Sequence, residues 1–303
     1  MIFSKNIKIN KINISDKNRV FIIAEAGVNH SGKLSVAKKL IDLAADSGVD
    51  AIKFQSFKAD QLILQKVSKA PYQKKITDPK QDQYSMLKLL EMNFNKTKAL
   101  KEYCEKKNLL FLSTPFDEKS LKDLIKLKLK AYKISSTDIN NPLLLKKIAL
   151  LNKPIFLSTG MSLLKDVEKA LKIISKHNKK IVLLQCTANY PIKDNEANLN
   201  VIKTYKKKFN ILTGFSDHTT GVGASPYSVA IGAAVIEKHF TLNKSLKGPD
   251  HKASLSPKEL KLFVKKIRKV EEYLGSYDKK ITESEKLTQK SLQKHIVARQ
   301  IIK

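Results

Sequence analysis

The chain has 303 residues, only two cysteines and a formal net charge of +30, which comes almost entirely from lysine because Arg19, Arg268 and Arg299 are the only arginines. Two cysteines exclude a disulfide scaffold, and lysines scattered along the chain without a basic arm argue against a nucleic-acid partner, since base readout favours the arginine fork. No N-terminal apolar run has the length of a secretory signal or a membrane span, so we expect a cytoplasmic protein without membrane association, whose charge helps to capture anionic metabolites.

Short apolar, β-branched runs alternate along the chain with longer stretches of helical periodicity, which is typical of parallel βα units. We predict eight strands, at residues 21–27, 51–57, 109–116, 131–136, 154–160, 180–187, 210–218 and 234–241. Predicted helices between them include residues 33–48, 84–107, 163–177, 199–209 and 222–233. Eight such units within roughly 250 residues predict an α/β fold of the (β/α)8 TIM-barrel type.

Three segments lie outside this regular pattern. Residues 1–20 precede the barrel, which we place at 21–275, and residues 58–83 form a long polar insertion after the second strand. Insertions of this length are usually functional or mobile. Residues 276–303 begin as a charged linker, and their last part, 291–299, has the composition of a strand with nothing to pair with.

Polar residues end all eight predicted strands, where a TIM barrel carries its chemistry. Lys53 and Lys133 lie within apolar strands, and burying an ammonium group is unfavourable unless an anion neutralises it. A bound phosphate or carboxylate would provide that anion. The alternative is a buried ion pair with Glu25 or Glu237, and both arrangements can occur at different stages of turnover.

Hydroxyl groups surround the same end of the predicted barrel. They can donate hydrogen bonds to phosphate oxygens beside the lysine charges, although a single serine at a strand end is more often a turn or cap residue. The interpretation therefore depends on their convergence in one ring. The residues are Ser113, Thr114, Ser136, Ser158 and Ser216.

Two histidines, His218 and His239, end neighbouring predicted strands. Two imidazoles can bind a divalent ion and leave positions open for water and substrate, as a catalytic site requires; the alternative is a pair of hydrogen-bonded rim histidines. Cys104 falls in a predicted helix and Cys186 is a lone, buried thiol, so a closed structural zinc site is not expected.

Carboxylates remain as candidates for proton transfer, for contacts with substrate hydroxyls or for support of a metal-bound histidine. They are Glu25, Asp138, Glu237 and Asp250. The residues alone therefore indicate a barrel enzyme that binds an anionic ligand beside a divalent metal, without naming its reaction.

Nine motifs in order resemble the sialic acid synthase family, over residues 21 to 275. They are AEAGVNHSG, AIKFQSFKAD, FLSTPFD, YKISSTDINN, PIFLSTGMS, LLQCTANYP, GFSDHTTG, IEKHFTL and GPDHKASLSPKEL. The resemblance implies a cytoplasmic homodimer that condenses phosphoenolpyruvate with the open-chain aldehyde of an N-acetylated amino sugar and releases phosphate.

The resemblance also implies roles for individual residues. His218 and His239 correspond to metal ligands, with manganese expected and magnesium possible, and Glu25 to the residue that handles protons. The implied phosphoenolpyruvate contacts are Lys53, Thr114, Lys133, Ser136, Ser158 and Ser216. The implied sugar contacts are Glu25, Asp138, Tyr190 and Asp250, with Tyr72 and Gln73 of the insertion covering the sugar.

The chain departs from the family pattern at two places. Ala188 stands where some members have a phosphate-binding asparagine. Members normally continue into a small antifreeze-like domain that caps the partner's active site, and residues 276–303 resemble a linker with only the first strand of that domain. We expect the barrel and the metal site to remain.

The acceptor is left open between N-acetylmannosamine and a 2,4-diacetamido-6-deoxy hexose, because the motif GPDHKASL is closer to sialate and legionaminate synthases than to pseudaminate synthases. Two other functions compete with the synthase. One is another metal-dependent barrel aldolase or lyase, and the other is a basic, non-catalytic binding protein.

Overall fold

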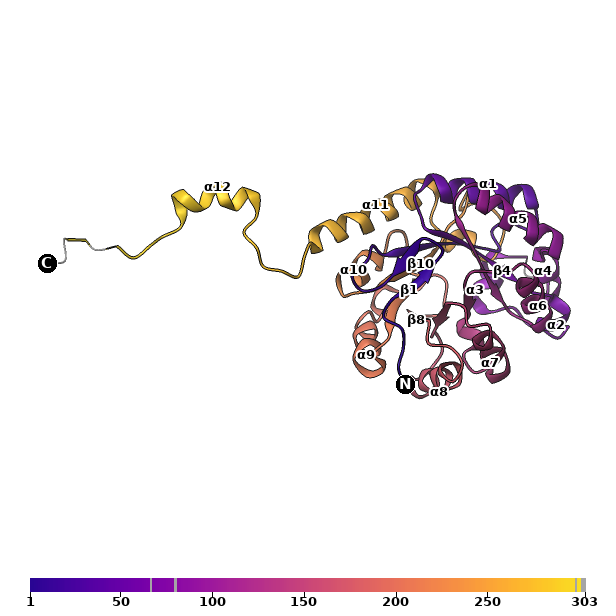
Figure 1. Cartoon of the computed structure of the whole chain (residues 1–303). Coiled ribbons are helices and arrows are strands. Elements are labelled where there is room, and N and C mark those ends of the chain that lie inside the picture. The colour runs from indigo at the N-terminus through magenta and orange to yellow at the C-terminus, as the bar shows by residue number, and fades with distance from the viewer. Residues whose placement is uncertain (66, 79–80, 298, 301–303) are drawn as a thin grey trace.

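The computed structural model describes residues 1–65, 67–78, 81–297 and 299–300. Its centre is an eight-stranded parallel sheet rolled into a barrel, with strand order β5-β4-β3-β10-β9-β8-β7-β6, and with the two end strands β5 and β6 lying against each other (Figure 1). The predicted TIM barrel is therefore confirmed. The strands are β3 (Phe21–Gly27), β4 (Ala51–Ser56), β5 (Leu110–Pro115), β6 (Tyr132–Ile134), β7 (Ile155–Ser158), β8 (Ile181–Cys186), β9 (Leu212–Asp217) and β10 (Val235–His239).

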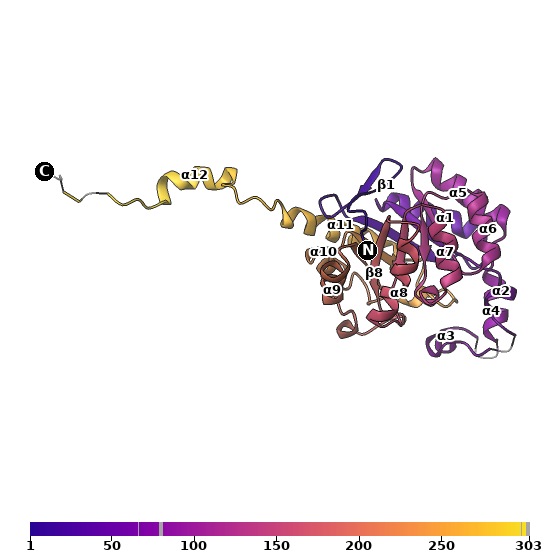
Figure 2. The same ribbon diagram turned by 60° about the horizontal axis from the view of Figure 1, so that its bottom comes forward.

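Helices surround the sheet and cover its outer face, except α12, which lies away from the barrel on the C-terminal segment (Figures 1 and 2). They are α1 (Leu34–Asp46), α2 (Ala59–Leu62), α3 (Pro71–Ile76), α4 (Gln83–Leu90), α5 (Phe94–Lys106), α6 (Glu118–Lys126), α7 (Pro142–Leu150), α8 (Leu164–Ser175), α9 (Asn200–Phe209), α10 (Ser225–Ala230), α11 (Pro257–Leu274) and α12 (Glu283–Leu292). The helix predicted over 84–107 is two helices, because Asn93 caps a new start at α5 by accepting from the backbone N–H of Lys96. The helix predicted over 222–233 is confined to α10.

The inside of the barrel is filled by alternate residues of the strands. Phe21 of β3 and Phe156 of β7 stack across it with ring centroids 5.7 Å apart. The N-terminal extension adds a hairpin, β1 (Ile7–Ile9) and β2 (Ile12–Ile14), whose buried isoleucines belong to the same apolar cluster. The hairpin therefore closes the end of the barrel where the strands begin, and the opposite end is left for the site.

The segment after α11 differs from its prediction. Residues 276–290, predicted as a linker, contain most of α12, and residues 293–297 form no strand. A strand needs a neighbouring edge to satisfy its backbone groups, and this segment extends away from the barrel (Figure 1). Within the described residues, no helix combines the length and the apolar character needed to cross a membrane.

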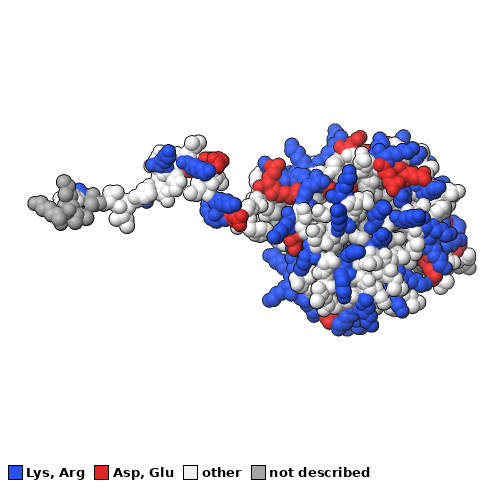
Figure 3. All heavy atoms as spheres, viewed as in Figure 1, with Lys and Arg blue, Asp and Glu red and all other residues white. Residues whose placement is uncertain are grey.

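Charged side chains are spread over the face of the molecule seen in Figure 3. On the face seen in Figure 3, lysine and arginine are distributed over the whole barrel and are interspersed with acidic groups. This distribution agrees with a compositional origin of the net charge, as we inferred from the sequence.

The buried residue His30 should make the free energy of unfolding depend on pH. Burial, together with Lys96 and His251, lowers the pKa of His30 to about 4, and only its Nδ1 has a partner, the backbone N–H of Gly32 at 3.0 Å. The unfolded chain takes up a proton here below pH 6.5, whereas the folded chain does so only near its own, lower pKa. We therefore expect this residue to remove about 3 kcal/mol from the free energy of unfolding as the pH falls from 6.5 to 4.

Urea unfolding at pH 7, 5.5 and 4 measures this loss. The variant His30→Gln should lose less stability over that range than the wild type, while His177→Gln, at an exposed position, should follow the wild type. An unchanged pH dependence in His30→Gln would show that His30 is not the group responsible.

Candidate active site

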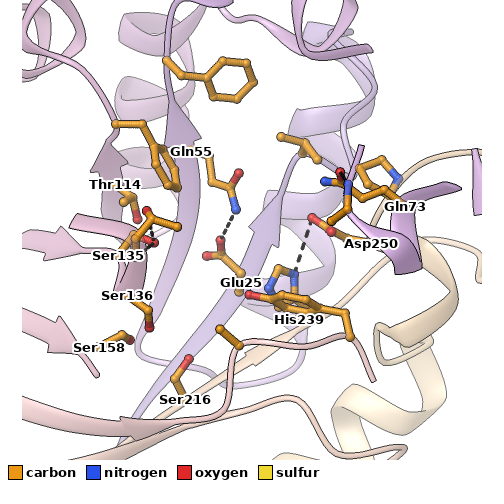
Figure 4. Close-up of a pocket in the computed structure, with 18 of the residues that line it drawn as sticks. Glu25, Gln55, Gln73, Thr114, Ser135, Ser136, Ser158, Ser216, His239 and Asp250 are labelled. Atoms are coloured by element: carbon orange, nitrogen blue, oxygen red, sulfur yellow. Dashed lines mark hydrogen bonds and ion pairs between the residues drawn. The ribbon is translucent and has the colours of Figure 1, made fainter. Parts of the chain in front are cut away.

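A cavity of about 450 Å³ opens at the carboxyl ends of the strands, within the size range of small-molecule sites. It brings together most of the site residues predicted from the sequence. Those that line it are Glu25, Lys53, Thr114, Lys133, Ser136, Ser158, Tyr190, Ser216, His218, Glu237, His239 and Asp250. Figure 4 shows the serines and Thr114 on one side of the cavity, with His239 and Asp250 facing them across Glu25.

Asp138 and Ser113 are not among the residues that line the cavity. Asp138 lies in a short turn beside it. It ends a 3-10 turn, Ser136–Asp138, and its carboxylate accepts from Thr137 Oγ1 at 3.2 Å and from Asn141 Nδ2 at 3.3 Å. With three residues per turn, successive side chains point about 120° apart, so Ser136 can face the cavity while Asp138 does not. The structure thus gives Asp138 a local structural role, and a contact with sugar is not supported by its position.

Four buried charged side chains form the base of the cavity, and we call them the charged floor: Glu25, Lys53, Lys133 and Glu237. Lys53 Nζ lies 2.9 Å from Glu25 Oε2 and 3.7 Å from Glu237 Oε2, and Lys133 Nζ lies 3.4 Å from Glu237 Oε1. None of the four is more than 4% exposed. The ion pairs considered from the sequence are therefore present in the structure.

The two carboxylates of the floor differ in their affinity for protons. Burial raises the pKa of Glu25 to about 7, although Lys53 opposes the shift. Burial acts in the same direction on Glu237, but Lys133 and Lys53 outweigh it and lower the pKa of Glu237 to about 2. Glu237 therefore holds both lysines as a permanent anion, whereas Glu25 can take up or release a proton near neutral pH.

Hydroxyl groups around the floor are arranged to donate to an anion. Ser158 Oγ is buried without a hydrogen-bond partner, and Thr114 Oγ1 accepts from Lys53 Nζ at 3.1 Å. Ser136 Oγ accepts from the backbone N–H of Gly160 at 2.9 Å, which leaves its own proton to donate. Ser113, by contrast, faces away, because adjacent residues of a strand point to opposite sides, and its Oγ pairs with Ser56 Oγ.

The two predicted metal ligands lie on the neighbouring strands β9 and β10 with ring centroids 5.7 Å apart. His218 Nδ1 lies 2.7 Å from the carbonyl oxygen of Thr187, so this nitrogen carries a proton, and in the neutral ring Nε2 has the lone pair. Although burial opposes the shift, the neighbouring Cys186 raises the pKa of His218. Tyr190 packs against both rings, and its ring centroid lies 4.0 Å from that of His218 and 5.4 Å from that of His239. The rings are thus fixed by a carbonyl and an aromatic neighbour.

The donor set fits an open, incomplete metal site. His239 Nδ1 is buried without a hydrogen bond, 3.9 Å from Asp250 Oδ2, and burial lowers the pKa of His239 well below its usual value, so the neutral ring has a lone pair to offer. In the part of the chain that the structure describes, no group of three or more His, Cys, Asp or Glu side chains is arranged to hold a metal. Two imidazoles would leave the remaining positions to water and substrate.

Several cavity residues were not selected from the sequence. Gln55 donates to Glu25 at 3.4 Å, and Cys186, interpreted only as a buried thiol, has its Sγ 3.9 Å from His218 Nδ1. Strand alternation could have identified both, because Gln55 shares a face with Lys53, and Cys186 shares one with the inward Leu184.

The predicted cover is partly present. Gln73 lines the cavity, together with Gln83 and apolar residues of the segment 57–90, and the side chain of Tyr72 lies outside the described part of the structure. Ala188 lines the cavity too, so a residue without a donor stands where we expected some relatives to bind phosphate.

Comparison with known proteins identifies the family. The sequence model of the NeuB family matches residues 40–279. The chain belongs to the NeuB family. It is 49% identical to N,N'-diacetyllegionaminic acid synthase of Campylobacter jejuni over 94% of this chain and 86% of that protein, and 43% identical to the enzyme of the same name from Legionella pneumophila over 92% and 80%.

A solved structure has the same fold. It is the N-acetylneuraminic acid (sialic acid) synthetase of Leptospira borgpetersenii in complex with citrate, with 34% identity, a TM-score of 0.84 and coverage of 97% of this chain and 99% of that chain. This NeuB-family chain is therefore an enzyme of the sialic acid synthase type, which condenses phosphoenolpyruvate with an amino sugar, as the motifs predicted. Family membership favours this function over an unrelated aldolase and over a basic binding protein.

The end of β3 provides a test of the site's geometry. Gly27 has a φ of +52°, and a Cβ added to it would lie 3.1 Å from Asp250 Oδ2 and 3.2 Å from His239 Cε1. We expect Gly27→Ala to displace these side chains and to lower kcat/KM by on the order of a hundredfold, the usual cost of a misplaced reacting group.

Gly48→Ala is the matched control, because Gly48 also has a positive φ, +75°, but nothing lies within 4 Å of the added Cβ. Both variants should lose similar stability in thermal unfolding, since alanine is strained at the positive φ of both positions. Equal kcat/KM in the two variants would contradict the proposed contact of Gly27 with the site.

Proposed function

We propose that the cavity binds phosphoenolpyruvate on the charged floor and the open-chain aldehyde of an N-acetylated amino sugar above it, beside His218 and His239. The observation that carries this proposal is the buried pair Lys53 and Lys133, held by Glu25 and Glu237 and ringed by hydroxyl groups. An incoming anion can exchange partners with these carboxylates. The positive charges of the two lysines are then neutralised both before and after the substrate binds.

The floor residues position phosphoenolpyruvate. Lys53 and Lys133 would hold its anionic groups, and Ser158, which has a free hydroxyl, would donate to an oxygen, as would Ser136. Ser216 donates to Glu237 Oε1 at 2.9 Å and would have to exchange this bond for one to the substrate. Thr114 orients the ammonium group of Lys53. Burial of these groups strengthens each interaction, because little water competes for them.

Glu25 has the pKa and the position for proton transfer. A carboxyl group with a pKa of about 7 is populated in both protonation states at neutral pH, and Gln55 and Lys53 fix its two oxygens. During the condensation, the new carbon–carbon bond joins phosphoenolpyruvate to the aldehyde carbon, and water replaces the released phosphate. Glu25 would exchange the protons that these steps require.

His218 and His239 would hold a divalent ion, manganese in preference to magnesium, and that ion supplies Lewis-acid polarisation of the aldehyde oxygen. Tyr190 and Asp250 would border the sugar, since both line the cavity next to the histidines. Of the two acceptors left open by the motifs, the similarity to the two diacetyllegionaminic acid synthases favours a 2,4-diacetamido-6-deoxy hexose.

We also propose a cytoplasmic homodimer. Its support is the exposed apolar side chains of α12 and the following residues, Leu287 at 83%, Leu292 at 72% and Ile296 at 105% exposure, which a second protein surface would cover. The cysteines Cys104 and Cys186 are free, in keeping with a reducing compartment.

One experiment tests both the reaction and the metal ligands. The full chain is incubated with phosphoenolpyruvate, Mn²⁺ and each acceptor, and phosphate and ketoacid are measured together with bound manganese. We expect phosphate release with the wild type, loss of manganese and at least a hundredfold loss of kcat in His218→Ala and His239→Ala, and neither loss in His177→Ala, at an exposed position. Unchanged manganese binding in both site variants would refute the ligand assignment, and no phosphate release with any N-acetylated hexosamine would refute the reaction.

A further inference from the structure

One part of the cavity is apolar and is not used by the chemistry described above. A satellite hydrophobic cluster, separate from the two that make up the barrel's core, contains seven side chains, and all seven line the cavity. We call them the apolar wall: Val28, Phe57, Leu62, Met86, Leu87, Leu90 and Phe116. A cluster that only packed the insertion against the barrel would not need every member to border the cavity.

The apolar wall lies closer to the mouth of the barrel than the charged floor does. Val28, Phe57 and Phe116 are each the first residue after a strand, β3, β4 and β5 respectively. The polar cavity residues Lys53 and Thr114 come earlier in β4 and β5, and four strand residues, the separation of Lys53 from Phe57, span roughly 13 Å. Because the strands are parallel, the cavity changes from charged to apolar along the barrel axis.

The rest of the apolar wall comes from α2 and α4, which belong to the segment between β4 and α5. Leu62 ends α2, and Met86, Leu87 and Leu90 lie on one side of α4. Leu89, on the other side of α4, is 70% exposed and does not line the cavity. The helix therefore presents leucine both to the cavity and to the solvent, which supplies a matched pair for experiments.

The polar residues that line the cavity include three uncharged amides, Gln55, Gln73 and Gln83. In Figure 4, Gln73 lies beside Asp250 and across the cavity from Ser135, Ser136 and Ser158, whereas Gln55 lies next to Glu25. Among the described residues around the cavity, the lysines are Lys53 and Lys133, both of the charged floor. A second phosphate at the level of the apolar wall would thus be desolvated without a cationic partner.

We infer that the apolar wall selects the acceptor by its distal end: it takes amino sugars whose last carbon is a methyl group, as in 6-deoxy sugars, in preference to those with a hydroxymethyl or phosphorylated end. This inference rests on the proposed function, in which the aldehyde lies next to the histidines and the floor, so the other end of the extended sugar points toward the mouth. There the methyl group is buried against Phe57, Met86, Leu87 and Phe116, and the amides bind the acetamido and hydroxyl groups.

The test measures binding in place of turnover, so that it does not depend on the reaction. The probes are the open-chain alditols of N-acetylmannosamine, of its 6-deoxy analogue and of its 6-phosphate, which lack the aldehyde and cannot condense. Each is titrated calorimetrically into the full chain saturated with phosphoenolpyruvate. We expect the 6-deoxy alditol to bind at least tenfold more tightly than the 6-hydroxy alditol, in the range by which apolar pockets discriminate a hydroxyl group, and the 6-phosphate to bind most weakly.

The matched variants are Leu87→Gln and Leu89→Gln, the same substitution on the two sides of α4. Leu87→Gln should reduce the preference for the 6-deoxy alditol to less than threefold, because the amide can pair with the 6-hydroxyl, and Leu89→Gln should keep the wild-type preference. Equal wild-type affinities for the 6-deoxy and 6-hydroxy alditols, or an undiminished preference in Leu87→Gln, would overturn the inference.

The outcomes separate this inference from the proposed function. Phosphate release from phosphoenolpyruvate and an aldehyde acceptor, measured in parallel, reports on the reaction. Turnover without a binding preference would refute the role of the apolar wall alone, whereas a binding preference that Leu87→Gln removes, without turnover of any acceptor, would uphold that role and refute the reaction.

Discussion

The constraint on which the site depends is the burial of two lysines and two glutamates in the charged floor. Removing four ionisable groups from water is costly, and their mutual attraction repays the cost only with close geometry, so a floor of this kind is a poor source of stability. In the proposed function, the floor instead allows the lysines to exchange a carboxylate partner for an anionic substrate. Lys53 and Lys133 are already desolvated and oriented, and an anionic substrate that replaces a carboxylate as their partner does not have to pay for their ordering again.

The floor also explains why two neighbouring carboxylates behave differently. Glu237 lies between both lysines and remains ionised, whereas Glu25 contacts one lysine and an amide, and burial dominates its pKa. A single strand-end arrangement thus supplies a fixed counter-ion and a carboxyl group that titrates near neutral pH. The neighbouring histidines His218 and His239 and the apolar wall extend this arrangement along the barrel axis, and the hairpin of β1 and β2 closes the opposite end.

Much of this arrangement could be predicted from the sequence because parallel strands obey strong local rules. β-Branched runs located all eight strands to within two or three residues, and the rule that barrel chemistry gathers at strand ends brought Lys53, Ser158 and His239 together correctly. Other details could not be predicted, because they depend on local turns and caps and not on the spacing of apolar residues. Asp138 lies at the end of a 3-10 turn and not among the residues that line the cavity, and the break between α4 and α5 depends on the cap formed by Asn93.

The apolar wall was missed for a different reason. The insertion 58–83 is polar in composition and contributes only Leu62 to the apolar wall. The other members lie just outside the insertion, as Phe57 and Met86 do, or far from it in the sequence, as Phe116 does. The segment after α11 was mispredicted because a β-rich composition needs an edge to pair with. The local sequence pattern therefore located many of the polar residues that line the cavity, whereas the tertiary contacts were needed to show which apolar residues surround them.

If the buried lysines of the charged floor bind the anionic substrate, the affinity for phosphoenolpyruvate must depend on them. Calorimetric titration of the wild type, Lys133→Met and Lys238→Met compares a floor lysine with another buried lysine, since Lys238 pairs with Asp217 at 2.9 Å but does not line the cavity. We expect phosphoenolpyruvate to bind at least tenfold more weakly to Lys133→Met and with unchanged affinity to Lys238→Met. Wild-type affinity in Lys133→Met would show that this lysine does not bind the substrate.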